Sequence, residues 1–213
     1  MRDLQDQRRS PFAGLTAIPA PTAALAPLPP MARFVFRGRP AAVELAGKAF
    51  GVALPTTACR AAVADSRAAL WLGPDEWLLL AAESEAAAIE QAFATALGDL
   101  PHSLVAVGHR NTALELVGPD AARVLNAGCP LDLSPDAFPV DGCTRTVLGK
   151  AEIVLWRTDP DRFHIEVWRS FARYVWQFLE EARRELAAEA ALRQERGVEA
   201  GAGPRHVPEL VAG

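Results

Sequence analysis

The chain has 213 residues, of which 50% are hydrophobic, and its formal net charge at pH 7 is -4. A nucleic-acid-binding surface normally carries clustered lysine and arginine and an excess of positive charge. Only two lysines occur, Lys48 and Lys150. The composition therefore argues against a nucleic-acid partner and predicts a globular chain, with apolar residues enough for one ample core or two small, tightly fused domains.

Residues 1–32 are rich in proline and alanine. Their prolines are Pro11, Pro19, Pro21, Pro27, Pro29 and Pro30. Proline continues neither a helix interior nor a central strand, so we predict that residues 1–32 form a mobile or draped arm. The prolines also interrupt every window that a signal peptide would need.

The cysteines and the apolar runs predict the compartment. Cys59, Cys129 and Cys143 are odd in number and form no CxxC pair, which argues against a disulfide framework and a structural zinc site. We expect Cys129 and Cys143 to be small buried apolar residues. A membrane span would need a stretch of about 18 apolar residues, and the sequence contains none. We therefore expect a cytoplasmic protein.

Two segments, 33–100 and 101–190, have the same order of predicted elements, and a loose tail follows at 191–213. In the first, the strands are Phe34–Arg37, Ala69–Leu72 and Trp77–Ala81, with helices after Gly38 and Ser84. In the second, the apolar runs are Ser103–Val107, Thr112–Val117, Ile153–Leu155 and Phe163–Val167, with a short helix through Leu125 and a long one after Ser170.

An internal repeat relates these segments. A shift of 80 places sets Phe34, Phe36 and Gly38 on Leu114, Leu116 and Gly118. A shift of 86 sets the helix-cap candidate Ser84 on Ser170, and the turn before Trp77 on the turn before Phe163. The second copy has a central loop that is longer by six residues. We therefore predict two related halves.

Each half resembles the ferredoxin-like arrangement of a sheet with helices on one face, which predicts an α+β fold of two tandem ferredoxin-like half-repeats fused into one unit. Alternation in the last two strands puts Val154, Trp156, His164, Glu166 and Trp168 on one face. Two tryptophans there indicate burial against the other half or another chain. We favour two sheets that cover each other.

The residues offer few candidates for chemistry. No phosphate loop, dinucleotide fingerprint or hydrolase motif occurs. His164 and Glu166 share a strand face, which permits an acid/base pair, half a metal site, or simply a hydrogen-bonded pair between the sheets. The sequence His109-Arg110-Asn111 predicts an ordinary polar turn between two strands, although a loop of this type can hold an anion. Trp176 lies off the apolar stripe of the last helix and predicts packing at a domain edge or a partner contact.

Three sequence runs carry a family resemblance. They are LWLGPDEWLLL (Leu70–Leu80), LVGPDAARVLNAGCPLDLSPDAFP (Leu116–Pro139) and VWRSFARYVWQFL (Val167–Leu179). Together they resemble the gamma subunit of heterotetrameric sarcosine oxidase over roughly residues 34–182. That family is similar in fold to the folate-binding domain of aminomethyltransferases, the T-protein of glycine cleavage.

The resemblance implies a complex that oxidises sarcosine to glycine, hydrogen peroxide and formaldehyde or 5,10-methylenetetrahydrofolate. It implies alpha, beta and delta subunits as partners, and FAD, FMN, NAD and tetrahydrofolate as cofactors of the complex. This chain shows no motif that would hold a redox cofactor, and we expect a structural role in assembly, with no catalytic or metal-binding residue of its own. Trp156, Trp168 and Trp176 are the candidates for partner contacts.

A folate enzyme of similar fold that acts alone is the alternative, and a freestanding scaffold is a third hypothesis. Fold similarity does not carry folate chemistry with it. Where the aminomethyltransferase pattern has paired aspartates, this chain has Ala151-Glu152, and its strand-ending Asp-x-Ser is replaced by Ala106-Val107-Gly108. We expect no folate turnover; Glu152, Arg157 and His164 are the residues to test.

Overall fold

The computed structural model describes residues 10–20 and 22–201, with side chains up to residue 193. The helical elements are α1 (Pro40–Phe50), the 3-10 turn η1 (Glu83–Glu85), α2 (Ala86–Leu97), α3 (Ala121–Asn126) and α4 (Ala172–Gly201). The strands are β1 (Ala24–Pro27), β2 (Met31–Gly38), β3 (Ala61–Ala64), β4 (Arg67–Gly73), β5 (Glu76–Ala82), β6 (His102–Ala106), β7 (Asn111–Val117), β8 (Cys143–Leu148), β9 (Ala151–Asp159) and β10 (Arg162–Trp168). The predicted α+β class is confirmed.

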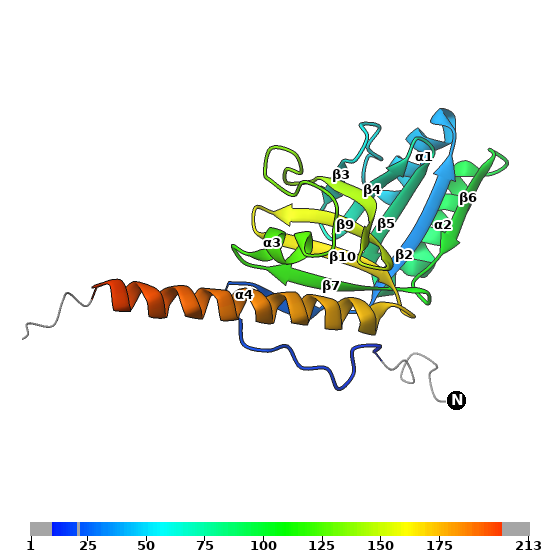
Figure 1. Ribbon diagram of the computed structural model, residues 1–213. Coiled ribbons are helices and arrows are strands. Elements are labelled where there is room, and N and C mark those ends of the chain that lie inside the picture. Colours follow the sequence, from blue (N-terminus) through cyan, green and yellow to red (C-terminus); the bar gives the residue numbers. More distant parts are fainter. Residues whose placement is uncertain (1–9, 21, 202–213) are drawn as a thin grey trace, which may run out of the picture.

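Two five-stranded sheets form the centre of the molecule. The first has the order β3-β4-β5-β2-β6 and the second β8-β9-β10-β7-β1, and neighbouring strands are antiparallel. The sheets pack against each other, with α1 and α2 outside the first and α4 lying along the outside of the second (Figure 1). The result is a layered arrangement of helices, sheet, sheet and helices.

The strand registers reproduce both sequence shifts. Phe36 lies opposite Trp77 in the first sheet, and Leu116 lies opposite Phe163 in the second. Trp71 also lies opposite Trp77 in the first sheet, and Arg157 lies opposite Phe163 at the corresponding place in the second. Alternation of apolar residues does not by itself make corresponding residues pair in both sheets. The shared strand register therefore indicates that the two halves have the same backbone arrangement.

The two halves exchange their edge strands. β1 precedes β2 in the chain but pairs with β7, and β6 precedes β7 but pairs with β2. The predicted division at residues 33–100 and 101–190 therefore does not follow the sheets, because β6 belongs to the first sheet and β1 to the second. Each sheet is completed by a strand from beyond its own half, which makes the unit a single fold.

Three apolar clusters among the described residues account for the layers. One lies between the first sheet and α1 and α2, and another between the second sheet, α3 and α4. The third lies between the sheets and includes Leu70, Leu78, Leu80, Cys143 and Val154. The prediction that the two sheets cover each other is confirmed.

The described part of the arm, from Ser10 on, lies against the second sheet and α4. β1 lies at the edge of its sheet, where Pro27 removes no internal ladder bond. Before it, the chain lies along α4: Ile18 N donates to Glu180 Oε2 at 2.9 Å, and Arg183 Nε donates to the Ala23 carbonyl at 2.6 Å.

Several other element predictions are corrected. Strands β1, β3 and β8 were missed, because their runs are short or interrupted by polar residues. Ser84 does not cap α2; it lies in η1, and α2 starts at Ala86. The loose tail predicted from residue 191 is helical up to Gly201, and residues 202–213 lie outside the described part. Among the described helices, none combines the length and apolar character needed to cross a membrane.

Gly118 provides a test of how tightly the arm is held. Its φ is +137°, and a Cβ there would lie 2.4 Å from the Thr22 carbonyl oxygen of the arm. Gly118→Ala should lower the free energy of unfolding by more than about 2 kcal/mol, because the strain of an alanine at positive φ and the clash of its Cβ with the Thr22 carbonyl are both unfavourable. Urea unfolding measures this.

Gly98→Ala is the matched control. Gly98 also has a positive φ, +48°, but a Cβ would meet nothing within 4 Å. Gly98→Ala should lower the free energy of unfolding by only about 1 kcal/mol, because backbone strain is its only unfavourable effect. Equal losses for the two variants would show that the arm does not press on Gly118.

Candidate functional site

A buried ionic cluster joins the two sheets. Arg33 on β2 donates from Nε to Glu166 Oε2 at 2.7 Å and to Oε1 at 3.0 Å. His164, two residues before Glu166 on β10, places Nε2 2.8 Å from Glu166 Oε1. Arg33 is 3% exposed and Glu166 1% exposed. His164 and Glu166 thus form a hydrogen-bonded pair between the sheets, one of the arrangements predicted from their shared face.

The cluster is built to hold charge in place. Burial raises the pKa of Glu166, but the hydrogen bond from His164 and the charge of Arg33 outweigh it and hold that pKa below its ordinary value of 4.5. An ionised carboxylate only accepts hydrogen bonds, so His164 Nε2 donates to it. Glu166 accepts hydrogen bonds from both Arg33 and His164, and the cluster is suited to joining sheets rather than to transferring protons to a substrate.

The thiols offer no nucleophile between the sheets. Cys143 is fully buried, and its Sγ lies 3.6 Å from the Trp71 carbonyl oxygen. Burial raises the pKa of the Cys143 thiol to about 12, which keeps it neutral and unreactive near pH 7. Cys129 is also buried, so both behave as the predicted small apolar residues.

The three candidate folate residues do not converge. His164 lies on the face between the sheets, with its ring centroid 5.6 Å from that of Trp156. Glu152 is on the same face of β9 but is exposed, 3.8 Å from Arg145 Nε. Arg157 points to the opposite, helix-covered face, where its guanidinium lies 4.7 Å from the Phe163 ring centroid. One folate molecule between the sheets would not contact all three.

Arg157 is itself a buried cation without an ion pair in the described part of the chain. It is 3% exposed, donates from Nη1 to the Phe138 carbonyl, and leaves Nε without a partner there. Burial lowers the pKa of its guanidinium, against the raising influence of Asp161. Its role is to anchor the loop that carries Phe138 onto the second sheet.

The three candidate interface tryptophans lie in three different places. Trp156 is partly buried between the sheets. Trp176 is 4% exposed and contacts Phe12 of the arm, with 5.9 Å between ring centroids. Trp168 is 40% exposed, so the other half of the chain does not bury it, and Arg110 stacks on its ring at 5.2 Å. They do not form one patch.

Sequence reasoning missed an apolar groove of about 820 Å³ on the first half. It lies between α1, the loop 51–60 and the ends of β4 and β5, and is lined by Pro40, Val43, Gly47, Ala53, Leu54, Trp71 and Trp77, among others. Its charged residues Glu44 and Lys48 pair with each other at 2.7 Å, so its rim is electrically neutral.

The second half shows what covers the equivalent place there. Trp71 and Trp77 correspond to Arg157 and Phe163, which are buried. The 16-residue loop 127–142 replaces the 10-residue loop 51–60, and brings Leu133 and Phe138 into the core. The signal was present in the sequence as the six-residue difference in loop length. The first half lacks this cover, and the groove stays open.

The ionic cluster predicts a pH-dependent stability. Because the folded-state pKa of Glu166 is below 4.5, the stability that it contributes is present above the unfolded pKa and is lost as the pH falls through the folded pKa. At pH 7, Glu166→Gln should lower the free energy of unfolding by about 3–5 kcal/mol, since it leaves Arg33 unpaired in the interior.

Urea unfolding of wild type and Glu166→Gln from pH 7 to pH 3 measures the effect, and the difference between the two proteins should shrink below pH 4.5. Glu44→Gln removes an exposed carboxylate whose pKa is also lowered, by Lys48, and should leave stability unchanged within error. A difference for Glu166→Gln that stays constant over this range would contradict the role of the ionised carboxylate.

Comparison with known proteins gives consistent matches. A model of the "Sarcosine oxidase, gamma subunit family" matches residues 37–185. "Sarcosine oxidase subunit gamma" from Corynebacterium sp. (strain P-1) is 38% identical over 125 residues, which cover 59% of this chain and 61% of the relative, less than two thirds of its length. Its counterpart from Corynebacterium sp. (strain U-96) is 35% identical over 176 residues, 82% of this chain and 76% of the relative.

Solved structures agree with these matches. A chain of the heterotetrameric sarcosine oxidase from Corynebacterium sp. U-96, in complex with pyrrole 2-carboxylate, is 31% identical with a TM-score of 0.78, over 85% of this chain and 97% of that one. The glycine cleavage system aminomethyltransferase T from Bartonella henselae is 18% identical with a TM-score of 0.58, over 75% of this chain and 46% of that one, and shares the fold. With a family model that matches well over half of its length, the chain belongs to the sarcosine oxidase gamma-subunit family.

Proposed function

We propose that this chain is the gamma subunit of a heterotetrameric sarcosine oxidase, in which it assembles with alpha, beta and delta subunits in the cytoplasm. The complex converts sarcosine to glycine, hydrogen peroxide and formaldehyde or 5,10-methylenetetrahydrofolate, and its FAD, FMN, NAD and tetrahydrofolate are bound by the other subunits. This chain completes the assembly without an active site of its own. The family match over residues 37–185 supports the assignment.

One observation supports the assembly role. The buried ionic cluster makes its contacts within the chain, whereas the groove on α1 is apolar and open. Arg33, His164 and Glu166 are buried in mutual contacts, so they are unsuited to receiving a substrate. The groove suits an apolar polypeptide segment, because in the second half a loop with leucine and phenylalanine side chains occupies the equivalent place. We assign the groove to a segment of this chemistry from a partner subunit.

A substitution in the groove tests this assignment. Ala53 lines the groove and is exposed, so Ala53→Trp should fill it without disturbing the core. Ala58 is exposed on the same loop but does not line the groove, and Ala58→Trp is the matched control. Each tagged variant is purified from its native host, with mass spectrometry and a visible spectrum of the eluate.

Wild type and Ala58→Trp should bring down the other subunits with flavin absorbance and sarcosine-dependent peroxide production. Ala53→Trp should recover at least about tenfold less partner protein, as expected if an apolar anchor is excluded from its pocket. A colourless, solitary wild-type chain would overturn the subunit proposal. Normal assembly of Ala53→Trp would overturn only the groove assignment.

Tetrahydrofolate binding tests the alternative of a folate enzyme that acts alone. Because Glu152, Arg157 and His164 lie apart, on two faces of the second sheet, we expect the isolated chain to show no heat of binding when it is titrated with tetrahydrofolate. Saturable binding that is lost in His164→Ala or Arg157→Met would instead favour the folate enzyme.

A further inference from the structure

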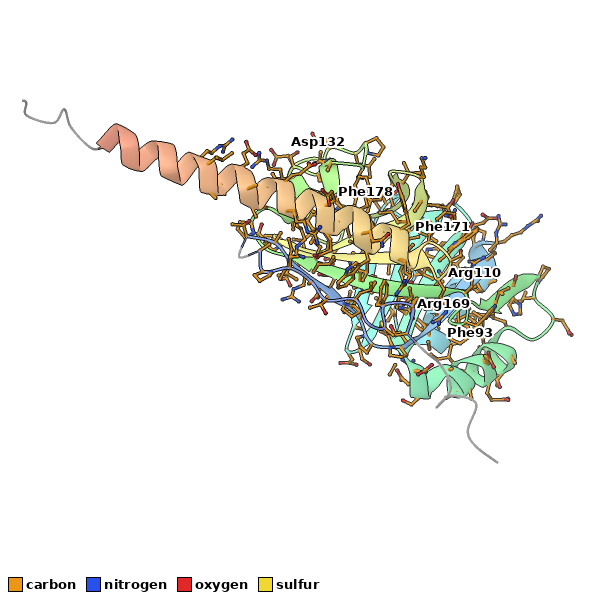
Figure 2. The ribbon with its side chains drawn as sticks, turned by 60° about the horizontal axis from the view of Figure 1, so that its bottom comes forward. Phe93, Arg110, Asp132, Arg169, Phe171 and Phe178 are labelled. Carbon is orange, nitrogen blue, oxygen red and sulfur yellow. The ribbon has the colours of Figure 1, made fainter. Side chains whose placement is uncertain are left out.

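The outer side of β6 is an open edge of the first sheet. β6 ends the strand order β3-β4-β5-β2-β6, and in the described part of the chain only β2 pairs with it. It lies at the margin of the molecule beside α2 (Figure 1), and Figure 2, in which the bottom of the molecule comes forward, shows it again at the margin, beyond the helix that carries Phe93. A strand edge of this kind presents backbone N–H and C=O groups that its own sheet does not bond.

The strand register shows which residues of β6 point their backbone groups outward. The Val107 amide donates to the Arg33 carbonyl of β2 at 2.8 Å. In an antiparallel pair, residues that bond the neighbouring strand alternate with residues that face away from it. The outward residues of β6 are therefore His102, Leu104 and Ala106. Within residues 10–20 and 22–201, the outward backbone groups of Leu104 and Ala106 have no hydrogen-bond partner.

The other three edges among the described strands have features that hinder the addition of a strand. On β1, Pro27 lies at an outward position and has no N–H to offer. On β3, the Ala61 amide donates outward to the Asp141 carbonyl at 2.8 Å, and on β8 the Cys143 amide donates outward to the Cys59 carbonyl at 3.0 Å. β6 has no proline, no such cover and no Asp, Glu, Lys or Arg. Natural proteins protect solvent-exposed edges by these means, so an edge without them indicates one that is covered in the working protein.

The chemistry of this edge selects an extended polypeptide segment as its cover. The backbone groups of a helix are bonded within the helix, so only an extended segment brings N–H and C=O groups to complete the ladder. An added strand would place side chains beside Leu104, which packs partly against the cluster under α1 and α2, and on the other face beside Val105, which is 50% exposed. Apolar side chains on the added strand fit both neighbours.

We propose that β6 binds an extended, apolar segment of a partner subunit, which adds to the first sheet as a further strand next to Leu104 and Ala106. This inference rests on the proposed function: in a complex with alpha, beta and delta subunits the strand comes from one of these and not from a second copy of this chain. The site is separate from the groove, because no residue of β6 lines the groove.

Two substitutions should block an added strand. Val105→Lys places a charge beside the outer edge, and Ala106→Pro removes an outward N–H without removing a bond to β2. Val63→Lys is the matched control, because Val63 is an exposed valine on β3, the opposite edge of the same sheet. All three changes affect exposed residues, so the Tm of each full chain should stay within about 4 °C of wild type.

Recovery of partners from the native host is the first readout. Wild type and Val63→Lys should bring down equal amounts of the other subunits, measured by mass spectrometry. Val105→Lys and Ala106→Pro should each recover at least about tenfold less, because an unbonded backbone group or a charge at the junction opposes binding.

Amide hydrogen exchange of wild type measures the ladder directly and needs no variant. In the free full chain, the Leu104 and Ala106 amides should exchange as fast as exposed amides, whereas the Val105 amide, which faces β2, should exchange slowly. In the purified complex, exchange of the Leu104 and Ala106 amides should slow at least about 100-fold, because both are then bonded to the added strand.

The outcomes separate this inference from the subunit assignment. A solitary wild-type chain would overturn both. Partners that come down with wild type, while Leu104 and Ala106 exchange as fast as in the free chain, would overturn the added strand alone, and so would normal recovery of partners by Val105→Lys and Ala106→Pro. Slow exchange of these amides in a dimer of the free chain would overturn the choice of a partner subunit and assign the edge to a second copy.

Discussion

The ion pair between Arg33 and Glu166 is the constraint on which the arrangement of the two sheets depends. The residues are 133 positions apart and lie on β2 and β10, central strands of different sheets. Two charges in an apolar layer are costly unless they meet each other with good geometry. The face-to-face packing of the sheets brings the two side chains together, and a sheet arrangement that separated them would leave two buried charges unpaired.

Exchange of edge strands makes the two halves one cooperative unit. Because β1 completes the second sheet and β6 the first, neither half retains all of its strand pairings if the other unfolds. The arm adds to this linkage on the outer side of α4. There, Arg183 donates to two carbonyls of the arm, those of Ala23 and Ile18. An internal repeat has thus become a single domain.

The two halves differ in what covers equivalent places on their sheets. In the second half, Arg157 lies in a buried position and holds the loop at Phe138. In the first half the corresponding residue is Trp71, and the shorter loop leaves it partly exposed in the groove. The groove is therefore open in the first half, where the loop is six residues shorter than in the second.

The sequence by itself determined the α+β class, the repeat with its two shifts, the core face of each main strand and the family, because these depend on local periodicity, turn residues and long specific runs. It also placed His164 and Glu166 on one face. It did not reveal Arg33 as their partner, the exchange of β1 and β6, or the burial of Trp176 under Phe12. Those contacts join residues far apart in the chain, and only the tertiary structure decided them, since side-chain period carries no information on which distant strand lies opposite.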